Sequence, residues 1–429
     1  MAHNDEGRSS SRRQFVRAAG ATIAVGSLAG CTSQIFGGDG GGGLKIGFYG
    51  PFSGPASNIG EQKQTAAELT RDLLNDEGGV HGEDIELVFG DSESEPAAGR
   101  NAVSRLIEQE SADIIGGGFH SDVALSVVEA TNNEGVPQII DEAVSSAIVD
   151  KINEQKLWNA FKTAPPSQSY GVGWRNLVSF MEENELGYFP FEDKTVSLVA
   201  EDTSYGLSIL DSVATELEDI GWEILSEDEV GIDETDFTSL LSRIESDDPD
   251  VVLAVQTTSS GAGNITRQFA QTGFENTHLF HNYGLFNNAA LETAGEAANG
   301  AFTLLNAGPI PDLLGELGFM DAWEEDNDIP LTGSVALSYQ NIRVIANLVD
   351  SFDSLDAFRS ASVDEWAEHV IGHDPINGGT GYISYQDNHQ AAWGDADTQP
   401  ALAYQIANQD TQLIWPEEFA TSEFDGSFY

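Results

Sequence analysis

The segment ADIIGGGFHSDVALSVVEATNNEGVPQIIDEA, residues 112–143, decides the fold of this chain. Its first apolar run predicts a short buried strand, SDVALSVVEATNNEG predicts a helix, and VPQIIDEA predicts another strand. Strands that alternate with helices of this length form a parallel sheet that helices cover on both faces. The segment therefore predicts an α/β fold.

The same alternation of strands and helices continues on both sides of this segment. Upstream, LKIGFYG and DIELVFGD predict strands, each followed by a helical pattern, and downstream the alternation restarts after Pro165-Pro166. Two such runs exceed one ordinary domain, so we expect two α/β lobes.

The N-terminal region has the features of an export signal. Arg12 and Arg13 precede an uncharged stretch from Ala18 to Gly30, which is short against the roughly 20 residues of a membrane-spanning helix. The arginine pair indicates the twin-arginine export route. We therefore expect residues 1–30 to be a signal and the glycine-rich residues 31–43 to be a tether.

Cys31 is the single cysteine of the chain and follows Leu28-Ala29-Gly30, which resembles a lipobox. This resemblance implies a lipid anchor on the outer face of the cell membrane. The alternative is an incidental or buried cysteine at the end of the signal. One cysteine cannot form an intramolecular disulfide.

The charge balance is strongly acidic, with 71 acidic and 18 basic residues and a formal net charge of −53. A phosphate backbone would be repelled, which excludes general nucleic-acid binding. Because acidic residues are spread along the chain and 40% of residues are hydrophobic, we expect a folded domain with an acidic surface. Salt screens such charge, and we expect a halophilic archaeal source.

Six motifs in order resemble the type I periplasmic-binding-protein fold, in the branched-chain amino-acid class of ABC-transporter substrate-binding proteins. They are KIGFYGPFSGPASNIGEQ, DEGGVHGEDIELVFGDSESEP, ADIIGGGFHSDVALSV, GVPQIIDEA, EDTSYG and GTGYISYQDNHQ, and the resemblance spans about Leu44 to Asn408. It implies two doubly wound parallel-sheet lobes joined by a hinge, with the boundaries 44–163 with 309–376 for the N-terminal lobe and 164–308 with 377–429 for the C-terminal lobe. It also implies a monomer whose lobes close over a small polar solute and deliver it to an ABC permease. It implies neither an enzyme nor a cofactor.

The resemblance also implies ligand-binding positions on both lobes. They are Ser53 and Ile59 in the loop Gly50–Gly60, and Ser121, Ala143, Ser145, Tyr205, Ser259 and Tyr283. Ser121 resembles a serine that binds a carboxylate at a helix N-terminus, with an ordinary N-cap serine as the alternative. Tyr205 resembles a tyrosine that closes over the ligand, with core packing as the alternative.

Two of these positions depart from the class. Ile59 stands where an aromatic residue is frequent, and Tyr283 stands where an acidic residue often pairs with the ligand's α-ammonium group. A buried ammonium without a carboxylate partner is costly. An amide, urea, a short acid or an aromatic acid therefore stays open as the ligand beside a branched-chain amino acid.

Other functions have weaker support in the sequence. We find no G-x-S-x-G elbow, Walker loop or Cys/His cluster, and expect no catalytic residue and no metal. His278 and His281 are three apart in a predicted strand and so point to opposite faces. GDSESEP is more typical of a solvated loop than of a cation site. A ligand sensor that is not coupled to transport would share the fold.

Overall fold

The structure is a computed structural model, and it describes residues 42–183, 191–326 and 329–428. The predicted export signal with Arg12 and Arg13, and the predicted anchor Cys31, lie outside the described residues. Within those three ranges, no helix combines the length and the apolar character needed to cross a membrane.

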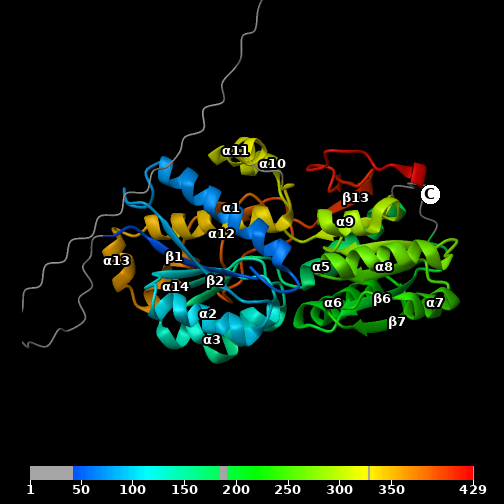
Figure 1. Ribbon diagram of the computed structural model, residues 1–429, viewed down its shortest axis with the longest axis horizontal. Helices are drawn as coiled ribbons and strands as arrows, with labels where there is room; N and C mark the ends of the chain where they lie inside the picture. The colour runs from blue at the N-terminus through cyan, green and yellow to red at the C-terminus, as the bar shows by residue number, and fades with distance from the viewer. Residues whose placement is uncertain (1–41, 184–190, 327–328, 429) are drawn as a thin grey trace, which may run out of the picture. The chain divides into compact units, whose positions relative to one another are not determined.

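The first lobe is built on a five-stranded parallel sheet with the order β2-β1-β3-β4-β5. Figure 1 labels its strands β1 and β2. Its strands are β1 (Lys45–Gly50), β2 (Glu86–Asp91), β3 (Ile114–Gly117), β4 (Gln138–Ile140) and β5 (Ala160–Lys162). The helices between them are α1 (Ser57–Asp76), α2 (Pro96–Glu108), α3 (Ser121–Glu134) and α4 (Ser146–Gln155). The strand and helix alternation predicted from the sequence is confirmed.

Alternation along β1 explains why helices cover both faces of this sheet. Phe48 packs in a core cluster with Ala67 of α1 and with Ile342, whereas Tyr49 packs in another cluster with Val103 of α2. Successive side chains of a strand point to opposite faces. An apolar strand without polar alternation therefore needs a helical layer on each side.

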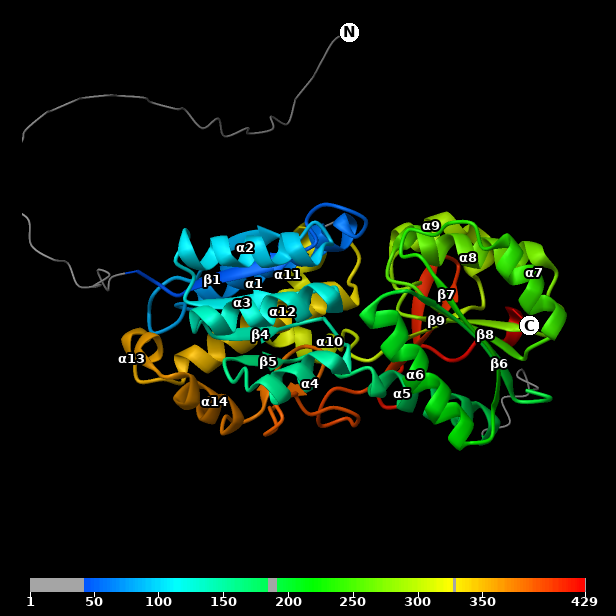
Figure 2. The same cartoon turned by 90° about the horizontal axis from the view of Figure 1, so that it is seen from below.

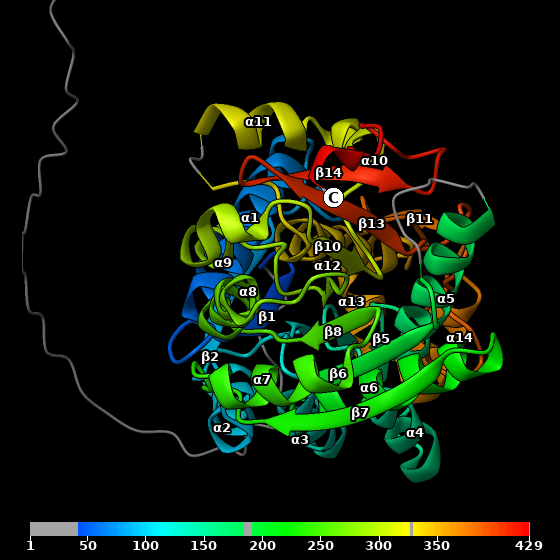
Figure 3. The ribbon, with the colours of Figure 1, turned by 90° about the vertical axis from the view of Figure 1, so that its right-hand side faces the viewer.

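The second lobe is built on a seven-stranded sheet with the order β14-β13-β10-β9-β8-β6-β7 (Figure 3). Its strands are β6 (Thr195–Glu201), β7 (Glu223–Val230), β8 (Val251–Val255), β9 (His278–Asn282), β10 (Phe302–Leu305), β13 (Leu402–Ala407) and β14 (Asp410–Trp415). Its helices are α5 (Gln168–Glu183), α6 (Ser204–Asp219), α7 (Thr238–Asp247), α8 (Ser259–Thr272) and α9 (Asn288–Ala294), followed by the 3-10 turn η1 (Gly295–Ala298). β13 and β14 pair antiparallel, so this sheet is parallel except at its C-terminal edge.

The chain passes to the second lobe after β5, returns after β10, and crosses again before β13. Figure 2 shows α12 to α14 grouped with the first sheet. The returning segment contains α10 (Pro311–Leu314), η2 (Gly315–Leu317), α11 (Phe319–Asp326), α12 (Gly333–Asp350), α13 (Leu355–Ser360), α14 (Val363–Ile371), β11 (Ile376–Asn377) and β12 (Tyr382–Ile383); η3 (Gly426–Phe428) lies near the C-terminus.

One expected boundary differs from the structure. Ile383, Tyr385 and Ala391 pack in the same core cluster as Leu44 and Phe161. This segment therefore packs with the first lobe, whereas the predicted boundaries assigned residues 377–429 to the second. The apolar alternation predicted extended backbone there, but it does not specify which of two cores receives it.

Candidate functional site

A cavity of about 220 Å³ lies between the two sheets, at the carboxyl ends of their strands. Ligands of open α/β sheets bind at such ends, where loops diverge from the sheet. The volume suits a molecule smaller than the drug-sized ligands of roughly 300–1,000 Å³ pockets. The lining residues are Ser94, Glu95, Pro96, Phe119, His120, Ser121, Asp122, Glu142, Val144, Tyr170, Glu201, Thr203, Tyr205, Ile232, Thr257, Tyr283, Leu305, Asn306, Ala307, Gly333 and Leu337.

Hydrogen bonds join the lobes beside this cavity. The Asp122 carboxylate, in the first turn of α3, accepts from the hydroxyl of Ser204 and, at 3.2 Å, from its backbone N–H. Ser204 begins α6, so a carboxylate faces a helix N-terminus, where the helix dipole favours negative charge. Asn58 Nδ2 also donates to Ser259 Oγ at 2.9 Å. The lobes are therefore in direct contact around the cavity.

The cavity wall is acidic. Glu95, Asp122, Glu142 and Glu201 line it, and no lysine or arginine of the described ranges does so. Glu201 is 1% exposed and comes from the end of β6. Burial raises its pKa, although Thr257 and Thr203 donate hydrogen bonds to its carboxylate. The charged groups that a ligand would meet in the lining of this cavity are therefore carboxylates.

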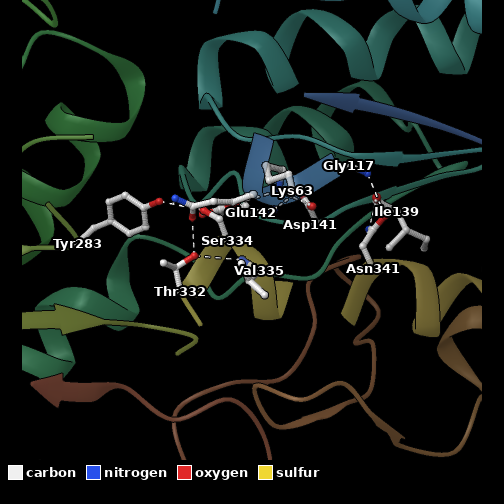
Figure 4. Close-up of polar contacts among 11 residues, drawn as sticks. Lys63, Gly117, Ile139, Asp141, Glu142, Tyr283, Thr332, Ser334, Val335 and Asn341 are labelled. Carbon is white, nitrogen blue, oxygen red and sulfur yellow. Dashed lines mark hydrogen bonds and ion pairs between the residues drawn. The ribbon is translucent and has the colours of Figure 1, made fainter. Parts of the chain in front are cut away.

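Glu142 is held by a buried lysine (Figure 4). Lys63 Nζ of α1 donates to Glu142 Oε2 at 2.9 Å and to Asp141 Oδ2 at 2.7 Å, and the Lys63 side chain is 0% exposed. Burial alone would lower the pKa of Lys63, but the charges of Asp141 and Glu142 outweigh it and raise that pKa. Burial also raises the pKa of Asp141 to about 7, against the opposing charge of Lys63.

Ser121 and His120 bring the start of α3 to the cavity. Ser121 Oγ accepts from the backbone N–H of Ser145 at 3.2 Å. The N-cap position of α3 is His120, so the alternative of an N-cap serine does not describe Ser121. Burial lowers the pKa of His120 to about 4, which keeps its ring neutral near neutral pH. A neutral imidazole offers one N–H donor and one acceptor.

The two predicted cavity tyrosines both line the cavity. Tyr205 lies in the first turn of α6, and its hydroxyl accepts from Asn282 Nδ2 at 3.1 Å. Tyr283 follows β9 with a φ of 69°, a left-handed conformation that is rare for a bulky residue. Such strain persists only where the surrounding structure imposes it, and it often marks a binding site.

The other predicted positions lie outside the cavity lining. Ser53 is exposed and bonds to Asp91, and Ile59 packs in an apolar cluster with Tyr283. Ala143 is 0% exposed in the core, between the lining residues Glu142 and Val144. Ser145 and Ser259 contribute the hydrogen bonds described above.

Sequence reasoning missed Glu142, Glu201 and their partners. Lys63 does carry a signal, since in α1 it shares a buried face with Ile59, Ala66 and Thr70. A lysine at that spacing on an apolar face indicates a buried ion pair, because a buried charge needs a partner. Glu142 carries a similar signal, since it follows a fully buried strand by two residues.

Comparisons with known proteins agree with this architecture. Residues 43–399 match the family described as "Periplasmic binding protein". The chain is 27% identical over 276 residues to Leu/Ile/Val-binding protein homolog 1 of Brucella melitensis, covering 64% of this chain and 70% of that protein.

Two solved structures share the fold. One is a branched-chain amino acid transporter substrate binding protein from Streptococcus pneumoniae in complex with isoleucine, with a TM-score of 0.73, 20% identity, and coverage of 87% of this chain and 100% of that one. The other is a solute binding protein of an ABC transporter from R. palustris in complex with benzoate, with a TM-score of 0.71, 20% identity, and coverage of 87% and 96%. With the match over residues 43–399, this chain belongs to the periplasmic binding protein family.

Proposed function

We propose that this protein captures a small amino acid, of the branched-chain type or a related one, and delivers it to an ABC permease. The observation that supports this ligand class most directly is the acidic cavity wall, in which no lysine or arginine of the described residues takes part. An ammonium group would relieve the repulsion among these carboxylates, whereas a free carboxylate alone would add to it.

The cavity also has a place for the carboxylate of an amino acid. Ser121 and His120 lie at the first turn of α3, where backbone N–H groups and the helix dipole favour an anion. Tyr283 replaces the acidic residue that the class often uses, but Glu142 and Glu201 supply carboxylates from other segments. The lack of an acid at position 283 therefore does not argue against an ammonium ligand.

An amide or urea is the second candidate. It is favoured by the small cavity and by the hydroxyl groups of Tyr205 and Tyr283 in its wall. A carboxamide pairs with such groups without bringing a charge into a buried site. A small carboxylic acid, also open from the sequence, meets the acidic wall without a lysine or arginine in the lining that the described residues form.

A ligand screen in about 3 M salt tests the proposal, with L-isoleucine, isobutyramide, urea and benzoate as probes. We expect L-isoleucine to bind with a dissociation constant near 1 μM, about −8 kcal/mol, and to raise the thermal midpoint. Tyr205→Ala should weaken binding, whereas Ser53→Ala, outside the cavity, should leave it unchanged. Binding of benzoate alone would contradict the proposal.

The same proposal covers attachment to the membrane. Arg12 and Arg13 direct export, and Cys31 carries the lipid that keeps the protein on the outer face of the cell membrane. A Cys31→Ser variant should appear in the medium, and its retention in the membrane would indicate an uncleaved signal. Genes for a permease and an ATPase beside this one would favour transport, and a kinase gene would favour sensing.

A further inference from the structure

A row of polar groups connects the buried core of the first lobe with the cavity wall of the second (Figure 4). Lys63 donates to Glu142 Oε2 at 2.9 Å. Ser334, at the start of α12, donates to Glu142 Oε1 at 2.6 Å, and its oxygen lies 2.9 Å from the hydroxyl of Tyr283. The row runs Lys63, Glu142, Ser334, Tyr283 and spans both lobes.

The chemistry of these groups fixes the direction of every proton in the row. A lysine ammonium only donates and an ionised carboxylate only accepts, so Glu142 orients the single hydroxyl proton of Ser334 toward itself. The Ser334 oxygen can then accept from Tyr283, 2.9 Å away. Burial, the charge of Glu142 and a hydrogen bond with the Glu142 carboxylate raise the pKa of Tyr283 well above its ordinary value, so the phenol keeps its proton and donates it to the Ser334 and Glu142 side of the row.

We infer that this row makes Tyr283 a hydrogen-bond acceptor toward the cavity and so selects ligands whose head group donates an N–H. The phenol O–H donates its hydrogen bond to Ser334, its oxygen retains lone pairs, and Tyr283 lines the cavity. An ammonium or a carboxamide can donate to it, while a carboxylate cannot. Glu142, Ser334 and Lys63 act as positioning residues, since they set the polarity of Tyr283. The inference rests on the proposed function of the same cavity.

Tyr205 and Tyr170 also line the cavity, from α6 and α5 of the same lobe as Tyr283. The donor-only indole N–H of Trp174 bonds to Asn282 Oδ1 at 3.0 Å, so the amide NH₂ of Asn282 must donate to Tyr205. Tyr170 is hydrogen-bonded to Tyr205 and accepts from the backbone N–H of Asn306. One of the two phenol protons is used in the bond between these tyrosines, so the other is not engaged in it. A head group with an acceptor oxygen and an N–H donor, as in amino acids and carboxamides, would fit this pair together with Tyr283.

The variant Glu142→Gln tests the row because it should reverse the direction of the hydrogen bonds from Glu142 to Tyr283. Lys63 can only donate, so the new amide places its oxygen on Lys63 and its NH₂ on Ser334. Ser334 then donates to Tyr283, whose own proton turns toward the cavity. With benzamide and benzoate as isosteric probes, we expect the natural chain to prefer benzamide by about tenfold and the variant to lose or invert that preference.

Two matched variants distinguish an effect of the hydrogen-bond row from an effect of the lost negative charge. Glu95→Gln removes a cavity carboxylate outside the row, and it should shift the benzamide-to-benzoate ratio less than Glu142→Gln does. Ser334→Ala interrupts the row and should bring the ratio toward one without inversion. Equal ratios in Glu95→Gln and Glu142→Gln would overturn the inference.

A ligand-free measurement distinguishes failure of the row from failure of the proposed function. If none of isoleucine, benzamide and benzoate binds the natural chain, the proposed function fails for these head groups. The infrared C–O stretch of Tyr283, isolated by subtraction of a Tyr283→Phe spectrum, still reports whether the phenol donates or accepts. We expect this band to shift in Glu142→Gln, and an unshifted band would overturn the row.

Discussion

Lys63 and Lys162 are both buried, but the groups around them differ in how far they compensate the lysine charge. Lys63, beside the cavity, has two carboxylate partners, and its pKa is raised. Lys162, where the chain first leaves the first lobe, donates to the carbonyls of Ala164 and Pro165 and to Gln390 Oε1. Burial lowers the pKa of Lys162 well below its ordinary value.

Both side chains are 0% exposed, so burial alone does not explain the difference. Formal negative charge compensates the desolvation of Lys63, whereas carbonyl dipoles compensate that of Lys162 only in part. The cavity wall thus contains a fixed ionic group, while the crossing segments are held together by a lysine that burial drives toward its neutral form.

The largest effect is expected from Lys63→Met, because it leaves Asp141 and Glu142 as buried carboxylates without a cation. We expect a loss of about 3 to 5 kcal/mol in the free energy of unfolding near pH 7. The loss should shrink near pH 5, since the folded variant then binds protons that the unfolded chain does not. Denaturant unfolding at both pH values measures this, and a loss below about 1 kcal/mol at neutral pH would contradict the ionic description.

His281 is a third buried base, and no carboxylate of the described residues contributes to its pKa shift. Burial lowers the pKa of His281 from 6.5 to about 3, and its ring contacts the hydroxyl of Thr266 at 2.9 Å. The unfolded chain binds a proton below pH 6.5 while the folded chain does not, so stability is lost as the pH falls from that value. For this residue alone the expected loss at pH 5 is about 2 kcal/mol.

His281→Gln is the matched variant for that measurement, since its amide can still donate to Thr266. The difference in unfolding free energy between pH 7 and pH 5 should be smaller in the variant by about 2 kcal/mol. Equal pH dependence in the two chains would show that His281 is protonated in the folded state.

Lys162→Met should cost less than Lys63→Met, about 1 to 2 kcal/mol, because it leaves polar acceptors and no buried charge. A lowered lysine pKa also means that the natural chain gains stability as the pH rises toward the ordinary lysine value of 10.5. The variant should lack this gain between about pH 7 and pH 9.5. Parallel pH profiles of the natural chain and the variant would mean that Lys162 stays fully charged in the folded protein.

The smallest effect is expected from salt. Salt screens exposed charges far more than buried pairs, so the loss caused by Lys63→Met should differ by less than about 0.5 kcal/mol between 0.5 M and 3 M salt. The thermal midpoint of the natural chain, with its net charge of −53, should rise over the same range. A loss that disappears in high salt would mean that water reaches Lys63.

The family resemblance located part of the site, at strand ends that can be read locally. Ser121, Tyr205 and Tyr283 each follow a predicted strand, and all three line the cavity. Ser53 and Ile59, assigned from the same resemblance, lie outside the lining. A loop can be assigned to the mouth of a site by pattern, but which of its side chains reaches the ligand depends on its exact path.

By itself the sequence determined the strand and helix alternation and the presence of two α/β lobes, because hydrophobic periodicity is a local property of the chain. Only the tertiary structure decided that Lys63 compensates Glu142, that Ser334 joins Glu142 to Tyr283, and that residues up to Ala391 pack with the first lobe. These contacts join segments far apart in the chain, and the free energy of a buried charge depends on which groups the fold brings beside it.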